Sequence, residues 1–174
     1  RDEAEAFVGV LESLGLQGTA LEIGLENGGT HLLFREIFQR VISIEVSLPK
    51  IMDFVNRVKL NHRSLIINGN STHRQTIGII EDYCPQVDLL FIDGDHSYDG
   101  VKQDFHNYSP LVKKEGIIAF HDIIEDYERR YGIVTFSCSG GVPKFWNEIT
   151  SNYRNAEFVK DYKQDGAGIG VIFL

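Results

Sequence analysis

Cysteine is scarce in this sequence of 174 residues, and Cys84 and Cys138 form neither a C-x-x-C pair nor a zinc-ligand spacing. We therefore expect no disulfide framework and a reduced, cytoplasmic setting. No apolar run reaches the ~18 residues that a membrane-spanning helix needs, so no membrane partner is expected. Clusters of Lys and Arg are also missing, and the net charge of -8 argues against a nucleic-acid-binding face.

Internal repeats and low-complexity segments are absent as well, and 43% hydrophobic with 24% charged residues is an ordinary globular composition. The length fits one domain, since ~100–200 residues per domain is usual. We therefore predict a single domain over residues 1–174. The sequence leaves open whether the protein forms a homo-oligomer.

One stretch of the sequence, TALEIGLENGGTHLLFREIFQRVISIE, organises the rest. It contains an apolar strand at Thr19–Ile23, a glycine-rich turn, an amphipathic helix and a second apolar strand at Val41–Ile44. Parallel strands bring their carboxyl ends to the same edge of a sheet. Glu22, the glycine turn and Glu45 are therefore expected to converge on one crevice.

The glycine turn has a spacing that distinguishes two cofactors. Dinucleotide-binding folds use G-x-G-x-x-G, whereas here Gly24 and Gly28 flank Glu26. Glu22 and Glu26 would repel a pyrophosphate and tolerate a cationic sulfonium, and Glu45 fits a ribose diol. The pattern resembles the E/D-x-G-x-x-x-G motif of class I S-adenosylmethionine-dependent methyltransferases. The alternative is a turn that merely joins a strand to a helix.

Strands and helices are expected to alternate through the rest of the chain, which predicts an α/β fold with a parallel sheet. Helices are expected at Asp2–Leu14, Thr30–Phe38, Lys50–Lys59, Thr76–Asp82, Val101–Val112 and Val142–Thr150, and strands at Ser64–Ile67, Val87–Ile92, Ile117–Phe120, Glu157–Tyr162 and Gly168–Leu174. Residues 123–141 break the alternation and are expected to form a variable loop over the site.

The end of the third predicted strand carries Asn70 and Ser71. At that position they would meet the same crevice and hydrogen-bond an adenine. The alternative is a surface turn, in which Asn and Ser are common.

Five ionisable residues follow two neighbouring strands: Asp93, Asp95, His96, His121 and Asp122. Carboxylates so close together repel one another unless protons or a cation intervene. Mg²⁺ and Mn²⁺ favour carboxylate oxygens, and a histidine ligand shifts the preference away from Mg²⁺. Asp93 and Asp122, helped by His121 or Asp95, are therefore candidate ligands of a divalent ion.

Two features of this cluster admit other roles. Asp95, Ser97 and Asp99 precede a predicted helix, where such residues usually cap the helix terminus. His96 lies three residues after Asp93 at an exposed edge, which makes it a candidate general base.

The run VDLLFIDGDHSYDGVKQDFHNYSPLVKKEGIIAFHDI resembles the core of methyltransferase family 24, whose relatives include cephalosporin-hydroxylase-like proteins and macrolide-sugar O-methyltransferases. With LEIGLENGG, SIE and GVPKFW, the resemblance covers most of residues 19–174. It implies a Rossmann-like, doubly wound, mostly parallel sheet in the order 3-2-1-4-5-7-6, ending in an antiparallel hairpin. It also implies bound S-adenosylmethionine and methyl transfer, commonly to oxygen.

The resemblance also assigns roles to single residues. In metal-dependent relatives an Asp at the position of Asp93 and an acidic pair at the positions of His121 and Asp122 hold magnesium. Here His121 replaces the first acid of that pair. The base of those relatives matches His96.

We therefore expect a methyltransferase that acts on a small hydroxylated acceptor, with Mg²⁺ or Mn²⁺ as a candidate second cofactor. The acceptor itself is not identified, and its pocket is expected between residues 123–141 and the N-terminal helix within residues 1–18. Two alternatives stay open: a non-catalytic domain that binds a cofactor or sugar, and a nicotinamide-dependent oxidoreductase on the same fold.

Overall fold

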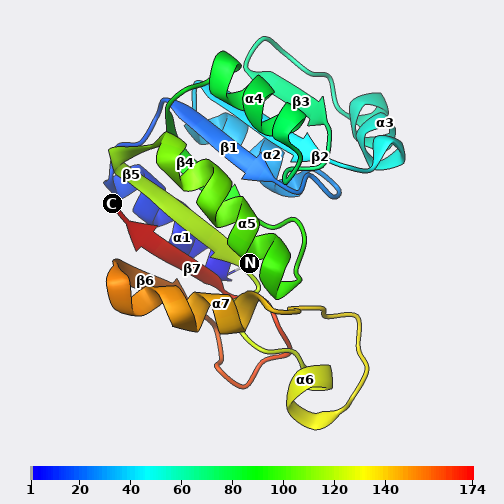
Figure 1. Cartoon of the computed structure of the whole chain (residues 1–174), viewed down its shortest axis with the longest axis vertical. Helices are drawn as coiled ribbons and strands as arrows, with labels where there is room; N and C mark the ends of the chain where they lie inside the picture. The colour runs from blue at the N-terminus through cyan, green and yellow to red at the C-terminus, as the bar shows by residue number, and fades with distance from the viewer. Residues whose placement is uncertain (1) are drawn as a thin grey trace.

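The computed structural model describes residues 2–174, in which helices and strands alternate (Figure 1). The strands are β1 Thr19–Ile23, β2 Arg40–Glu45, β3 Ser64–Asn68, β4 Val87–Ile92, β5 Val112–His121, β6 Arg154–Phe158 and β7 Ile169–Phe173. The helices are α1 Asp2–Ser13, α2 Gly29–Ile37, α3 Leu48–Arg57, α4 Arg74–Tyr83, α5 Tyr98–Tyr108, α6 Tyr127–Tyr131 and α7 Val142–Ile149. Short 3-10 turns follow α5 at Ser109–Leu111 and α7 at Thr150–Asn152.

The seven strands form one sheet in the order β3-β2-β1-β4-β5-β7-β6, which confirms the order implied by the family resemblance. The first five strands are parallel, and β7 runs antiparallel to both β5 and β6. The apolar runs of β1 and β4 are buried almost throughout, as expected for strands covered on both faces.

Helices cover both faces of the sheet, as Figure 1 shows. On one face α4, α5 and α7 pack over the sheet through Ile80, Phe105 and Trp146, among other buried residues. On the other face Phe7 of α1 and Phe34 of α2 pack over the same strands. Among the described residues, no helix is long and apolar enough to cross a membrane.

The strand order reverses between β1 and β4, because the chain moves from β1 to β2 and β3 on one side and returns to β4 on the other. Ile23 at the end of β1 pairs with Ile44 of β2 and with Ile92 of β4. In open α/β sheets ligands bind outside the carboxyl ends of the strands at such a reversal.

Most element boundaries lie within two residues of the sequence prediction, and the larger differences are at α5, β5 and β6. The helix expected over Val101–Val112 runs from Tyr98 to Tyr108, and the strand expected over Ile117–Phe120 begins at Val112. Pro110 explains the earlier end, because proline has no N–H to continue the helical bonds. The strand expected over Glu157–Tyr162 is instead Arg154–Phe158, and the backbone turns where Gln164 N donates to Asp161 O at 2.8 Å.

Residues 123–141 contain the short helix α6, which stands away from the sheet on an extended segment (Figure 1). The Asp126 side chain accepts from Arg129 N at 2.9 Å at the start of α6, and Gly132 ends it with φ 70°. The tip beyond α6 is apolar and open to solvent, with Val134 77% exposed and Phe136 fully exposed.

Candidate functional site

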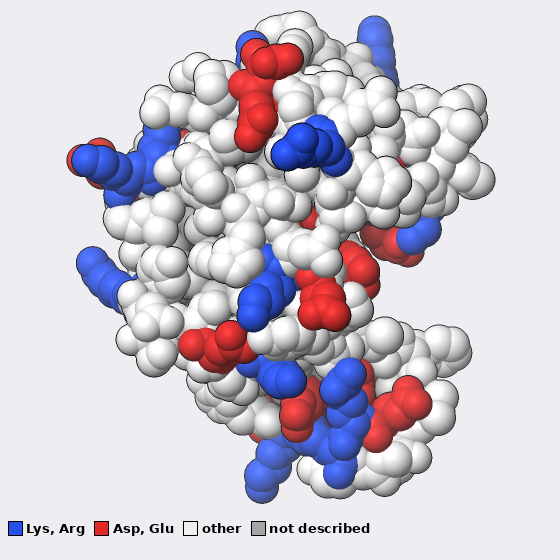
Figure 2. Space-filling view, viewed as in Figure 1, with Lys and Arg blue, Asp and Glu red and all other residues white. Residues whose placement is uncertain are grey.

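A cavity of about 240 Å³ lies at the carboxyl ends of the strands where the strand order reverses. Figure 2 shows a hollow in the outline between the main body and the part that carries α6, with acidic side chains along its edge. The predicted residues that line the cavity are Gly24, Glu45, Asn70, Ser71 and Asp93. The crevice expected from the sequence is therefore present, although two of the residues expected in it, Glu22 and Gly28, lie elsewhere.

Gly24 occupies a position that no other residue fits. Its φ is +93°, and a Cβ there would lie 2.0 Å from the carbonyl oxygen of Asp93. Gly24 N donates to Ile44 O at 2.9 Å, and Asp93 N donates to Ile23 O at 2.9 Å. The glycine thus lets the turn after β1 pass against the end of β4 at the cavity.

Gly28 has a different role from the one predicted. It has φ +75° at the start of α2, and a Cβ there would lie 2.2 Å from the ring of Phe54. It does not line the cavity. The buried Phe54 of α3 therefore requires this glycine for packing.

Glu22 is predicted to line the crevice, but its side chain points to one face of the sheet and not towards the strand ends. Alternate side chains of a strand point to opposite faces of a sheet. Glu22 is 1% exposed, and its carboxylate accepts from the Ser43 hydroxyl on the α2 face of the sheet. His31 Nδ1 lies 2.7 Å from Ser43 Oγ, and His31 Nε2 lies 3.0 Å from Ser64 Oγ. Burial raises the pKa of Glu22 to about 8 and lowers that of His31 to about 4. Glu22 is therefore mostly uncharged at neutral pH.

Glu22 and Glu26 are the acids predicted to repel a pyrophosphate, but the negative charge of the cavity comes from other acids. Glu26 forms an ion pair with Lys50, which offsets its charge. Glu45, Asp93 and Asp95 line the cavity as well. Asp93 lies against His96 and His121, so Glu45 and Asp95 are the acids that line the cavity without forming an ion pair with a positively charged side chain among the described residues.

Glu45 faces the cavity and also holds the glycine turn. One carboxylate oxygen accepts from the backbone N–H groups of Leu25 and Glu26, both at 3.2 Å. The other accepts from Ser47 N at 2.7 Å. The carboxylate is thus fixed in place, with lone pairs left over for a ligand.

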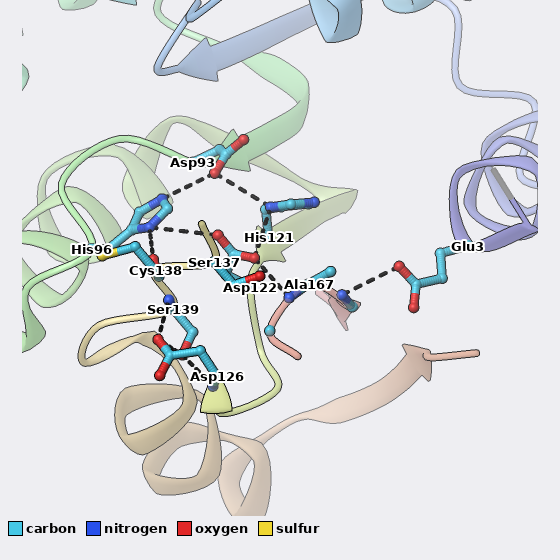
Figure 3. A network of polar contacts seen from close by, with 12 residues as sticks. Glu3, Asp93, His96, His121, Asp122, Asp126, Ser137, Cys138, Ser139 and Ala167 are labelled. Carbon is cyan, nitrogen blue, oxygen red and sulfur yellow. Dashed lines mark hydrogen bonds and ion pairs between the residues drawn. The ribbon is translucent and has the colours of Figure 1, made fainter. Parts of the chain in front are cut away.

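Beside the cavity, Asp93, His96, His121 and Asp122 meet as expected from adjacent strand ends (Figure 3). His96 Nε2 lies 3.2 Å from Asp93 Oδ1, and His96 Nδ1 lies 3.5 Å from Asp122 Oδ2. His121 Nδ1 lies 3.5 Å from Asp93 and 3.4 Å from Asp122.

Both histidines are surrounded by groups that favour their protonated forms. The hydrogen bond to Asp93 is the main cause that raises the pKa of His96 to about 9. Hydrogen bonds to Asp122 and Asp93 outweigh burial and raise the pKa of His121 to about 10. A base must first lose its proton, so the role predicted for His96 requires that these carboxylates be neutralised by another charge.

The cluster offers oxygen and nitrogen ligands at a spacing that suits a divalent ion. Ligand atoms of Asp93, His96 and Asp122 all lie within 4.8 Å of one another. This set contains His96 in place of the predicted His121. His121 Nδ1 is also buried, and its contacts at 3.5 Å to Asp93 and 3.4 Å to Asp122 are not well-aligned hydrogen bonds, so it lies beside the same two carboxylates as His96.

The position of His96 depends on a segment that the sequence did not connect with it. His96 Nδ1 contacts the carbonyl oxygen of Cys138 at 2.5 Å, within the loop 123–141. Asp126 accepts from Ser139 N at 2.8 Å and from its hydroxyl at 3.0 Å, which closes the base of this loop (Figure 3). A backbone carbonyl leaves no signature in a sequence, so this contact had no signal.

The capping interpretation applies to part of the cluster. Ser97 caps α5 by accepting from Gly100 N at 3.0 Å. Asp95 accepts from Ser97 N at 2.8 Å and also lines the cavity. Asp93 and Asp122 cap no helix, and both carboxylates face His96 and His121 instead.

Comparison with known proteins gives a family match: residues 21–123 fit the sequence model of a family described as a methyltransferase domain. An uncharacterized protein of Acanthamoeba polyphaga mimivirus is 32% identical over 159 residues, covering 77% of this chain and 72% of that protein. An uncharacterized protein of Sinorhizobium fredii is 30% identical over 102 residues, which is 59% of this chain. The chain spans only 9% of the length of that second relative.

Solved structures with the same fold include O-methyltransferases. A candidate caffeoyl-CoA O-methyltransferase from Staphylococcus aureus has 20% identity and a TM-score of 0.77, covering 99% of this chain and 83% of that one. An O-methyltransferase from Bacillus cereus in complex with SAH has 18% identity and a TM-score of 0.68, with coverages of 95% and 77%. TomG from Streptomyces achromogenes, in complex with SAM, has 13% identity and a TM-score of 0.74, with coverages of 97% and 78%. At such identities the likeness shows the fold alone.

Proposed function

The chain belongs to the methyltransferase-domain family whose model matches residues 21–123, and from this premise we propose that it transfers a methyl group from S-adenosylmethionine to an oxygen of a small hydroxylated acceptor. The observation that carries the proposal is the acid-lined cavity at the strand reversal, where Gly24 brings the backbone of β1 against β4. S-adenosylmethionine supplies an activated methyl group on a positively charged sulfur.

The cavity offers a partner for each part of this cofactor. The fixed carboxylate of Glu45 would accept from the two ribose hydroxyls, and Asn70 and Ser71, which line the same cavity, would bind the adenine. The charges of Asp93 and Asp95 favour the sulfonium and ammonium groups, since opposite charges attract. A pyrophosphate would meet the same carboxylates unfavourably, which argues against a nicotinamide dinucleotide.

The cluster beside the cavity provides the acceptor chemistry. His96 is the proposed general base, because its imidazole lies against Asp93, which lines the cofactor cavity. A positive charge bound beside Asp93 and Asp122 disfavours the protonated imidazole, since like charges repel. A divalent cation would also lower the pKa of an acceptor hydroxyl. Mn²⁺ suits the carboxylates of Asp93 and Asp122 with the imidazole of His121 better than Mg²⁺ does, and this set leaves His96 to act as the base.

Calorimetric titration with S-adenosylhomocysteine tests the cofactor assignment. Glu45→Gln is expected to lower the affinity by about tenfold or more, because hydrogen bonds to a charged group contribute ~1.5–3 kcal/mol. Glu36→Gln on the exposed side of α2 is the matched control and should bind like the wild type. Release of S-adenosylhomocysteine from S-adenosylmethionine with a panel of hydroxylated acceptors then tests turnover.

Two results of this experiment would contradict the proposal. Binding of reduced nicotinamide dinucleotide in place of S-adenosylhomocysteine would favour an oxidoreductase. Tight cofactor binding without turnover on any hydroxylated acceptor would favour a binding domain.

A titration with Mn²⁺ tests the metal assignment. Binding is measured as the loss of the free-ion signal in electron paramagnetic resonance. Asp122→Asn is expected to lower Mn²⁺ affinity at least about tenfold, since a carboxylate ligand is lost. Asn tolerates the left-handed backbone of Asp122, whose φ is 60°, so the loop should keep its shape. Asp95→Asn, which changes an acid outside the ligand set, is the control. Equal losses in both variants would argue against a defined site.

A further inference from the structure

Two polar side chains of α5, Asp104 and Tyr108, lie behind the wall of the cavity, and both are 0% exposed. The Tyr108 hydroxyl donates to the backbone carbonyl of Ser71 at 2.7 Å. A Cβ on Gly94 would lie 3.5 Å from Asp104 Oδ2. Ser71 and Gly94 both line the cavity, so α5 supports this wall from behind.

The Asp104 carboxylate lacks partners of its own. Neither oxygen accepts a well-aligned hydrogen bond from any described residue. A fully buried carboxylate without donors is unusual, because the loss of hydration is then uncompensated. Such a group indicates a role that is completed by another molecule or by a small rearrangement.

Ser71 is a donor whose side chain interacts with Asp104. Burial raises the pKa of Asp104 to about 6, and the Ser71 side chain opposes this rise, whereas the charge of Asp95 adds to it. The carboxyl is therefore ionised at pH 8 and can only accept hydrogen bonds. A modest rotation of the half-buried Ser71 hydroxyl would satisfy it.

A serine hydroxyl has a single proton and two lone pairs. If the Ser71 hydroxyl donates its hydrogen bond to Asp104, Ser71 presents only lone pairs to the cavity. Ser71 then pairs with a ligand N–H donor and meets a ligand carbonyl oxygen unfavourably. Buried polar groups left unpaired discriminate strongly between ligands that differ by one donor.

We propose that Asp104 is a positioning residue that fixes Ser71 as a hydrogen-bond acceptor, and that it thereby selects a cofactor base with an exocyclic amino group over one with a carbonyl oxygen there. The inference rests on the proposed function, because it takes the ligand to be an S-adenosyl compound. It extends that function by naming the groups that read the base.

The test compares S-adenosylhomocysteine with its deaminated analogue S-inosylhomocysteine, in which a 6-oxo group replaces the 6-amino group and the adjacent N1 carries a proton. Calorimetry at pH 8 is expected to give the wild type a preference for the amino compound of about tenfold or more, because the carbonyl compound would leave the Ser71 acceptor unpaired. In Asp104→Asn the side-chain amide can donate to Ser71 instead, so the preference should fall towards one.

Two further variants separate positioning from general support. Tyr108→Phe removes the bond to the Ser71 carbonyl but keeps Asp104, and it should weaken both ligands equally and leave their ratio unchanged. Ser71→Ala should lower the ratio as Asp104→Asn does. Adding Asp104→Asn to Ser71→Ala should then have no further effect, because the two residues act as one unit.

An unchanged ratio in Asp104→Asn would overturn the inference while leaving the proposed function intact. Where Asp104→Asn does not fold, an unchanged ratio in Ser71→Ala overturns it equally. A wild type that binds neither compound would remove both the inference and the proposed function.

Discussion

Replacement of His96 by alanine is expected to lower kcat by about 10²- to 10⁴-fold, the usual contribution of a positioned general base. His96 does not line the cofactor cavity, whereas its neighbours in sequence Asp93 and Asp95 do. The affinity for S-adenosylhomocysteine should therefore stay close to that of the wild type. Release of S-adenosylhomocysteine under saturating cofactor and acceptor measures the first quantity, and calorimetry measures the second.

His106→Ala provides the control for the His96 variant, because His106 is an exposed histidine on α5 and should leave both quantities unchanged. Loss of cofactor binding in His96→Ala would place this side chain in the cofactor pocket instead. Loss of Mn²⁺ binding would make His96 a metal ligand, as its spacing with Asp93 and Asp122 permits. The base would then have to be sought elsewhere.

Gly24→Ala is expected to destabilise the fold and to lower cofactor affinity at least about tenfold. An alanine at φ +93° is strained by ~1–3 kcal/mol. The overlap of its Cβ with the Asp93 carbonyl oxygen, at 2.0 Å, adds a penalty of similar size, since backbone atoms cannot move aside. Chemical denaturation measures the free energy of unfolding, and calorimetry with S-adenosylhomocysteine measures the affinity.

Gly29→Ala is the matched control in the same turn. Nothing lies within 4 Å of a Cβ at Gly29, which opens α2, and alanine favours a helix. This variant should be as stable as the wild type or slightly more so, and it should bind the cofactor normally. Equal losses in both variants would mean that the turn tolerates no substitution, and the specific role of Gly24 would be wrong.

Much of the fold followed from local patterns and from the family resemblance. The apolar runs of β1 and β4 identified strands buried on both faces, and Gly24 marked the turn between β1 and α2. The resemblance supplied the strand order, which local patterns alone do not contain. Boundaries were less accurate, because Pro110 ends α5 at Tyr108, four residues before the predicted end at Val112.

The predicted site was correct in its location and less so in the direction of single side chains. Glu22 lies on a strand that ends at the cavity, but its carboxylate points to the face of the sheet that α2 covers. There it accepts a hydrogen bond from Ser43. Gly28 packs against the ring of Phe54, which lies 26 residues further along the chain, and a side chain at Gly28 would overlap that ring. Such pairings depend on packing between distant segments, which spacing in the sequence does not encode.

Asp104 shows where a signal was present. It lies on the buried stripe of α5 that includes Val101, Phe105 and Tyr108. A carboxylate on a buried apolar face needs a hydrogen-bond donor or a cation beside it, because burying it alone is unfavourable. The spacing of Val101, Phe105 and Tyr108 predicts packing, and the same helical spacing places Asp104 on that buried face.

The position of β7 has a consequence for synthesis. β7 lies between β5 and β6, although it follows β6 in the sequence. While a ribosome is still making residues 122–168, the nascent chain presents β5 with one open edge, built from the apolar residues Ile117–Phe120. Unpaired edges of this kind recruit other chains and promote aggregation. Slow translation of this interval should therefore raise the need for chaperones.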